Sequence, residues 1–276
     1  MGGCITMAEY WELVGLLQNA ILAGAVLGVM GGLIGTFVMA RDMAFAVHGI
    51  AELTFAGAAV GLLFGIGVIP GAIIGALIAA AIIGLLGEKA RDRNSIVAVL
   101  MPFGLGLGIA FLALTPGRSV NKFGLLTGQI VAVADTQLQV VTGMAIVVTI
   151  ALLLMWRPLL FASVDAHVAA SRGVPLRALS LGFMLLLGLA VAVSVQVIGA
   201  LLVLALLVTP AAAALKLSSS PVVVPLLAMA FGVVSMVGGI LLAIPWAIPV
   251  SPFITTVAFV LYLAAWAIGS RRKWRA

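Results

Sequence analysis

Long apolar runs, separated by short breaks rich in polar residues, proline or glycine, make up most of this chain. The runs are about 20 residues long, which is the length that a helix needs to cross the hydrocarbon core of a bilayer. A membrane β-barrel would instead show short segments of alternating hydrophobicity. The pattern therefore predicts an all-α, polytopic transmembrane helical bundle. Nine spans are expected, with eight as the alternative, near residues 14–39, 45–67, 70–87, 95–114, 138–156, 177–195, 198–215, 222–244 and 252–269.

The composition supports an integral membrane protein with one transmembrane domain over residues 1–276. Hydrophobic residues make up 64% of the chain and charged residues 8%, and the mean hydropathy is +1.36, whereas a soluble domain is about 25% charged. Glu9 and Glu12 precede the first run and no basic n-region is present, so we expect no signal peptide. Segment 1–13 is expected to lie outside the membrane. The single cysteine, Cys4, excludes an internal disulfide.

The basic residues predict the orientation of the spans. If the N-terminus is outside, 12 of the 14 lysines and arginines fall on the cytoplasmic side, and only Arg118 and Lys122 fall outside. The positive-inside rule then places the basic C-terminal tail, residues 270–276, in the cytoplasm. The formal net charge of +6 is explained by this topology, so nucleic acid is not an expected partner.

His48 and Glu52 stand out because they interrupt an apolar run. Four residues are about one helical turn, so both side chains leave the same face of one helix. A carboxylate within the hydrocarbon layer costs about 2.5 to 3.5 kcal/mol on insertion scales unless it is protonated, paired or facing water. An imidazole and a carboxylate can share a divalent cation such as zinc, manganese or iron.

Two other interpretations of this pair remain open at this point. The pair could form a proton pathway, or it could be a His–Glu hydrogen bond that only packs two helices. We prefer a transported metal, because two ligands are too few for a tight site, and a transport path must let its ion leave.

A second informative segment lies between the fifth and sixth predicted spans. It predicts a short amphipathic helix at about residues 163–173, started by Ser163 or Asp165 and ended by Gly173. Its apolar side holds Phe161, Val164 and Val168. The helix contains a single basic residue, Arg172, so a protein partner is favoured over a lipid surface.

No G-x-x-x-x-G-K-[ST] motif occurs in the chain, so we do not expect it to be an enzyme. If transport through these helices uses ATP, a separate subunit must bind and hydrolyse the nucleotide.

Four segments are similar to the permease subunits of metal-type ABC importers, which take up zinc, manganese or iron. They are Arg41-Asp-Met-Ala-Phe with the following polar pair and Gly57, then Phe123 to Asp135, Asp165 to Pro175, and Ile198 to Ala214. The last segment is the most specific, and together the segments span nearly the whole chain. Family members typically carry Asp and then His in the second span, where this chain has His48 and Glu52.

The resemblance implies a permease that forms a homodimer in the plasma or inner membrane. It implies an ATP-binding subunit docked on a coupling helix through Asp165, Ala169, Arg172 and Gly173, and an extracytoplasmic metal-binding protein that delivers the ion. His48 and Glu52 would contact the transported ion, with Asp135 as a weaker candidate that could equally cap a helix. No cofactor is expected beyond the cargo itself. The expected cargo is zinc first and manganese or iron second, and the rival function is a proton-coupled secondary carrier.

Overall fold

The computed structural model describes residues 7–87, 90–115, 128, 130, 133–246 and 249–273, with only the backbone described at residues 90, 91, 272 and 273. Cys4, Arg118, Lys122 and the last three residues of the basic tail lie outside this part of the chain. The helices in the described part are α1 (Met7–Leu16), α2 (Gln18–Ala40), α3 (Ala44–Leu63), α4 (Val68–Leu86), α5 (Ala90–Leu114), α7 (Asp135–Val164), α8 (Ala166–Ser171), α9 (Leu176–Ile198), α10 (Ala200–Leu217), α11 (Val223–Ala243) and α12 (Val250–Lys273).

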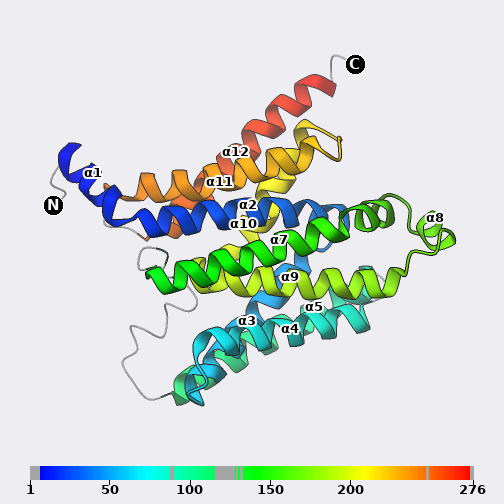
Figure 1. The fold of residues 1–276 in the computed structure, drawn as a ribbon, viewed down its shortest axis with the longest axis horizontal. Coiled ribbons are helices and arrows are strands. Elements are labelled where there is room, and N and C mark those ends of the chain that lie inside the picture. Colours follow the sequence, from blue (N-terminus) through cyan, green and yellow to red (C-terminus); the bar gives the residue numbers. More distant parts are fainter. Residues whose placement is uncertain are drawn as a thin grey trace. The chain divides into compact units, whose positions relative to one another are not determined.

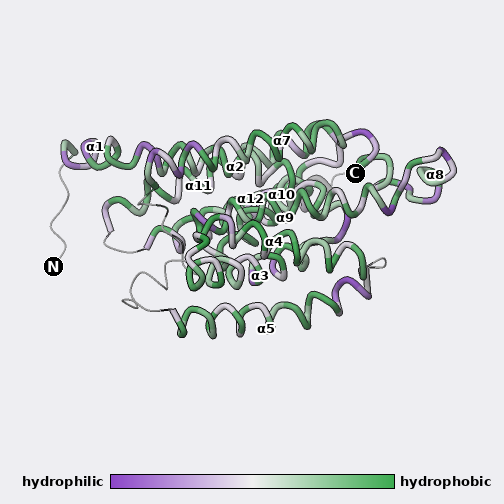
Figure 2. The backbone as a smooth tube through the Cα atoms, turned by 60° about the horizontal axis from the view of Figure 1, so that its bottom comes forward, coloured by the Kyte–Doolittle hydropathy of each residue, from purple (hydrophilic) through white to green (hydrophobic). Residues whose placement is uncertain are grey.

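The prediction of an all-α membrane bundle is confirmed. Within the described residues, nine helices are long and apolar enough to cross a bilayer, namely α2, α3, α4, α5, α7, α9, α10, α11 and α12. Figure 2 shows hydrophobic residues along most of the helix lengths and hydrophilic ones at α1, α8 and the first turn of α5. Nine spans is therefore the better of the two predicted counts for the described chain.

The chain divides into two compact units, each built from separate stretches of sequence. The first contains residues 1–36, 129–145 and 205–276, and the second contains residues 37–128 and 146–204. Helices α2, α7 and α10 each continue from one unit into the other. The prediction of a single domain over the whole chain stays a prediction.

In the first unit, glycines bring α2 into close contact with α11. A Cβ atom added at Gly28 would lie 2.7 Å from the backbone of Gly232, and one at Gly32 would overlap the backbone of Ala228. One turn earlier, Gly24 faces the side chains of Met236 and Ile240. The four-residue glycine spacing in α2 therefore allows this close packing, since small residues let helix backbones approach where lipid removes the hydrophobic driving force.

The second unit contains α3, which packs against α4, α5 and α9 (Figure 1). Gly57 and Gly61 of α3 face the backbone of Gly67, Gly71 and Gly75 at the start of α4. Gly65, four residues after Gly61, lies outside α3 in a turn with φ +71°, and a Cβ added there would meet nothing within 4 Å. Its role is to reverse the chain between α3 and α4, because positive φ is readily adopted by glycine.

Two helices differ from their predicted bounds. Residues 7–16 form α1, although residues 14–16 were expected to belong to the first span. The Tyr10 hydroxyl of α1 donates to the carbonyl of Leu241 in the same unit at 3.3 Å. Helix α7 was expected to end near residue 156 but continues through Pro158 to Val164. Its 30 residues correspond to a length of about 45 Å, against a hydrocarbon thickness of about 30 Å. Helix α7 is therefore longer than a span perpendicular to the bilayer requires.

The contact between α3 and α4 gives a test of this packing. A Cβ at Gly57 would lie 2.8 Å from Cα of Gly75, so Gly57→Ala should push the two helices apart and lower the stability by about 1–3 kcal/mol. Gly106→Ala is the matched control, since a Cβ at Gly106 in α5 meets nothing within 4 Å. The measurement is the midpoint temperature for loss of the monodisperse peak in detergent. Equal midpoints for the two variants would contradict the close packing.

Candidate functional site

His48 and Glu52 lie one turn apart in the first half of α3, as the sequence predicts. The Nε2 atom of His48 is 3.7 Å from Oε1 of Glu52. The imidazole side chain is 24% exposed, whereas the carboxylate side chain is 5% exposed. The histidine therefore stands between the surface of the chain and a carboxylate buried behind it.

The distance between the two side chains is too long for a hydrogen bond, since N–H···O bonds measure about 2.7–3.2 Å. Nδ1 of His48 and Oε2 of Glu52 are also buried without a hydrogen-bond partner. Buried polar atoms in folded proteins are nearly always paired, so unpaired ones need an explanation. A mutual hydrogen bond that only packs helices is thus disfavoured.

The same geometry suits a shared cation. Two ligand atoms bound to one ion at about 2.1 Å each can stand no more than about 4.2 Å apart, so a separation of 3.7 Å lies within reach. Among the described residues, no group of three or more His, Cys, Asp or Glu side chains could hold a metal. If His48 and Glu52 bind an ion, ligands from water or from another molecule would have to complete its coordination.

Glycines of α5 bring that helix directly against α3 at the level of the pair. Gly104 lies against the backbone of Glu52, where an added Cβ would be 3.1 Å from the carbonyl carbon and 2.7 Å from Cδ1 of Leu53. About one turn earlier in α3, Gly49 directly follows His48 and faces Val97 of α5. A Cβ atom added at Gly49 would lie 2.9 Å from Cγ1 of Val97. The close approach of α5 therefore fixes the part of α3 that carries both polar side chains.

The corner between α2 and α3 sets where α3 begins. The amide of Met43 donates to the carbonyl of Val38, and the amide of Asp42 donates to Met39. These two bonds form a Schellman arrangement, in which the residue after the helix adopts a left-handed conformation. Asp42 holds that place with φ +52°, where glycine is the usual residue.

Arg93 of α5 completes this corner. Its Nη2 donates to the carbonyls of both Arg41 and Asp42 at 3.1 Å, and the residue is 7% exposed. The helix end leaves carbonyls without intrahelical partners, and a guanidinium with several donors in one plane can satisfy two of them together. These two bonds from Arg93 tie the corner before α3 to α5.

Aromatic residues hold the other arginine of the corner. The guanidinium carbon of Arg41 lies 5.6 Å from the centre of the Phe183 ring in α9, within cation–π range. The Phe183 ring is itself 6.2 Å from Phe37, which packs edge-on against Trp156 at 4.8 Å. The corner is therefore linked to α9 through Arg41 as well as to α5 through Arg93.

Asp135, the weaker ligand candidate, lies at the exposed start of α7 in the first unit. Its Oδ1 accepts a hydrogen bond of 2.7 Å from Nδ2 of Asn19 at the start of α2. The same Asn19 nitrogen donates to the carbonyl of Val133 at 3.3 Å. This bonding gives the carboxylate a structural partner, and its role in metal entry stays a prediction.

The predicted coupling helix is present as α8, with shorter bounds than expected. Asp165 caps it, since Oδ1 accepts from the amides of His167 and Val168 at 2.9 and 3.0 Å. Ser163, the alternative start, belongs to α7, where its hydroxyl donates to the carbonyl of Leu159. Figure 1 shows α8 at the turn between α7 and α9.

The end of α8 repeats the arrangement found at the end of α2. Gly173 has φ +81°, its amide donates to Ala170, and the amide of Val174 donates to Ala169. An added Cβ at Gly173 would contact nothing within 4 Å, so glycine is favoured here for its backbone rather than for space.

Exposure divides the predicted coupling residues into two groups. Ala169 is 0% exposed and anchors α8 to its own chain, while Asp165, Arg172 and Gly173 are exposed. The apolar side chains of Val164 and Val168 are 80% and 44% exposed. Helix α8 therefore presents a mixed polar and apolar surface.

Arg93 is the structural residue at this site that sequence reasoning missed. It was counted only as one of the basic residues that set the orientation. The available signal was the Arg41-Asp42-Met43 sequence, which ends one apolar run and starts the next without a glycine or a capping side chain. Such a corner needs a donor from elsewhere in the chain.

Comparisons with known proteins agree with this fold. Residues 14–269 match the model of the ABC 3 transport family. The manganese transport system membrane protein MntC of Halalkalibacterium halodurans is 31% identical over 265 residues, covering 94% of this chain and 91% of that protein. The manganese import system permease protein ScaB of Streptococcus parasanguinis is 27% identical, covering 93% and 92%.

Solved structures show the same architecture. PsaBC from Streptococcus pneumoniae, in complex with a Fab, superposes with a TM-score of 0.85 at 26% identity over 94% of this chain and 95% of that one. An inward-facing putative metal-chelate type ABC transporter has a TM-score of 0.69 at 17% identity, covering 92% and 97%, which supports the fold alone.

The two buried ionisable residues near this site should affect stability in opposite directions. Glu52→Met removes a buried oxygen without a partner and should raise the stability by about 1 kcal/mol. Arg93→Met leaves two corner carbonyls without their donor and should lower it by about 1–3 kcal/mol. Thermal unfolding in one detergent measures both. A large loss of stability in Glu52→Met would show that the carboxylate serves the packing instead.

Proposed function

Because the chain belongs to the ABC 3 transport family, we propose that it is the membrane-spanning permease of an ATP-driven importer of a divalent metal, with manganese as the first cargo. The observation that carries this proposal is the His48–Glu52 pair, whose facing atoms are 3.7 Å apart without a hydrogen bond. A site of this kind offers a cation two donors and retains it only while further ligands are present.

Manganese replaces zinc as the preferred cargo for two reasons. Relatives that share 27% and 31% of their residues with this chain are named for manganese, and none of the relatives reported above is named for zinc. Carboxylate and water ligands suit manganese, whereas imidazole nitrogen suits zinc, so a mixed pair admits either. Zinc and iron are the competitors that an uptake assay has to separate.

A second copy of the chain would complete the coordination. Two His48–Glu52 pairs give four protein ligands, and water molecules can supply the rest of the octahedral shell that manganese prefers. Such a shared site opens when the two copies move apart, which suits a transported ion better than a stored one. We therefore propose a homodimer with the pathway between the protomers.

The proposed partners follow from α8 and from the family. An ATP-binding subunit would dock on the exposed surface of α8, and an extracytoplasmic binding protein would deliver the metal at the opposite face. The protein would lie in the plasma or inner membrane with its N-terminus outside, because that orientation places nearly all lysines and arginines in the cytoplasm.

Uptake of radioactive manganese tests the cargo site. His48→Ala and Glu52→Gln should each reduce uptake by more than about ten-fold at equal membrane abundance, since even groups that only orient a metal ligand contribute about 10–100-fold to affinity. Thr54→Val is the control in the same helix, because the Thr54 hydroxyl bonds only to the Ile50 carbonyl at 2.7 Å. Inhibition of this uptake by unlabelled zinc or iron ranks the preference for the three metals. Wild-type uptake in both variants would remove the pair from the pathway, and uptake that follows the proton gradient without the ATPase subunit would favour a secondary carrier.

The docking role of α8 has a separate test. Asp165→Ala removes the cap and should destabilise the helix by about 0.5–2 kcal/mol, whereas Asp165→Asn keeps a capping oxygen. We expect the alanine variant to co-purify about five-fold less ATPase subunit and the asparagine variant to behave as wild type. Normal ATPase binding by Asp165→Ala would contradict the assignment of α8 as the docking helix.

A further inference from the structure

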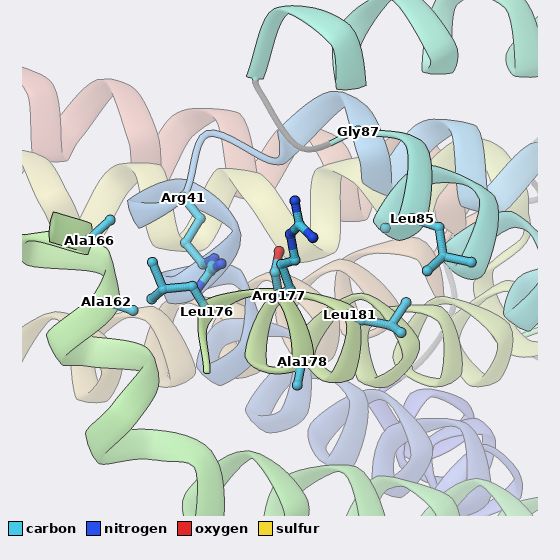
Figure 3. Close-up of a pocket in the computed structure, with 11 residues that line it drawn as sticks. Arg41, Leu85, Gly87, Ala162, Ala166, Leu176, Arg177, Ala178 and Leu181 are labelled. Atoms are coloured by element: carbon cyan, nitrogen blue, oxygen red, sulfur yellow. The ribbon is translucent and has the colours of Figure 1, made fainter. Parts of the chain in front are cut away.

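The second unit contains a cavity of about 600 Å³ at the end of the helices where α8 lies. It is lined by Arg41 from the α2–α3 corner and by Arg177 from the first turn of α9. Apolar side chains form much of the remaining wall, among them Leu85, Leu176, Leu181 and Ala162. Figure 3 shows Arg41 and Arg177 entering this space from two different elements, with Leu176 next to the Arg41 guanidinium.

The charge of the described cavity wall is entirely positive. Two arginines and no Asp or Glu occur among the described residues that line it. Nη1 of Arg41 is buried and has no hydrogen-bond partner. Burial and the positive charge of Arg93 both lower the pKa of Arg41 below its ordinary value. An anion in the cavity would oppose that effect and provide the missing acceptor.

The backbone adds donors at the same place. The cavity is lined by Leu176, Arg177 and Ala178, which form the first turn of α9, and Pro175 caps this helix without a side-chain hydrogen bond. The amides at the start of a helix have no intrahelical acceptor and favour negative charge. Two guanidinium groups and a helix start therefore surround one space whose other walls are apolar.

We propose that this cavity binds the phosphate group of an anionic phospholipid from the cytoplasmic leaflet. Arginine pairs with phosphate through two parallel hydrogen bonds, and basic pockets between membrane helices are suited to such headgroups. The apolar wall includes Leu85 near the end of α4, which is 63% exposed, and the next residue, Leu86, is 64% exposed. These two leucines would provide a surface for the glycerol backbone and upper acyl chain. A small inorganic anion would use the arginines but not these leucines.

The proposed lipid site involves the same corner that starts α3. Arg41 belongs to the cavity, and its own carbonyl accepts from Arg93. The wall also includes Ala162 of α7 and Ala166 of α8. A bound phospholipid would therefore contact the helix ends next to α8 as well as the corner that leads into α3.

The experiment measures stabilisation of the purified full-length protein in detergent by added lipid. Phosphatidylglycerol should raise the unfolding temperature, and phosphatidylcholine with the same acyl chains should have little effect. Arg41→Gln and Arg177→Gln should each weaken the apparent affinity for phosphatidylglycerol by about five-fold, since one arginine near a charged lipid surface contributes about 1 kcal/mol. Arg271→Gln, an exposed arginine near the end of α12, should change it by less than about two-fold.

Further arms make each outcome decisive. If Arg41→Gln fails to fold, Arg177→Gln provides the same measurement from an exposed position. Arg41→Lys keeps the positive charge but cannot form the bidentate hydrogen bonds of a guanidinium group. Inorganic phosphate is the second probe, and stabilisation equal to that by phosphatidylglycerol would overturn the lipid assignment. Equal losses in Arg271→Gln and Arg177→Gln would overturn it as well, by showing a diffuse charge effect. Unchanged lipid affinity with lost ATPase binding in Arg41→Gln and Arg177→Gln would assign the arginines to a protein contact instead.

Discussion

Close approach between helix backbones is the constraint on which the rest of this structure depends. Inside a bilayer, apolar side chains gain little by leaving lipid for protein, so helices associate through tight packing and small residues. In this chain, α3 can lie against α4 only because Gly57 and Gly71 have no side chains, and against α5 only because Gly104 has none. This packing buries Glu52, a residue that would otherwise contact solvent or lipid.

The second requirement is that every helix end in the membrane region finds partners for its backbone groups. The corner between α2 and α3 meets this requirement with two local bonds and one long-range donor, Arg93. The turn after α8 meets it locally, with Gly173 in the left-handed conformation. One turn thus uses an arginine from another helix, whereas the other uses bonds within its own backbone.

The positions of the spans followed from the sequence because hydropathy and length decide them almost alone. The ends of helices did not, since they depend on single hydrogen bonds. Arg157 and Pro158 were interpreted as the end of a span, but α7 continues past them because proline removes one bond without preventing the next turns. Ser163 and Asp165 have equal capping potential in sequence, and only the structure shows the serine bonded back into α7.

The candidate site could be predicted from the sequence because its two residues are chemically unusual within an apolar span. Two ionisable residues at helical spacing in an apolar run are rare enough to be noticed without any structure. The sequence could not predict the 3.7 Å separation between Nε2 of His48 and Oε1 of Glu52, the unpaired Nδ1 and Oε2 atoms, or the hydrogen bonds from Arg93. These features depend on how α5 packs against α3.

The aromatic cluster beside the corner has an optical consequence. Trp156 lies edge-on to Phe37, which neighbours Phe183 and thereby the Arg41 guanidinium. Trp11, Trp246 and Trp266 are each more than half exposed, so phenylalanine can replace them with little effect on packing. Replacing Trp274 as well leaves Trp156 as the single tryptophan in the sequence. The intrinsic fluorescence of the remaining indole would then report movement of this corner during a transport cycle, without any attached dye.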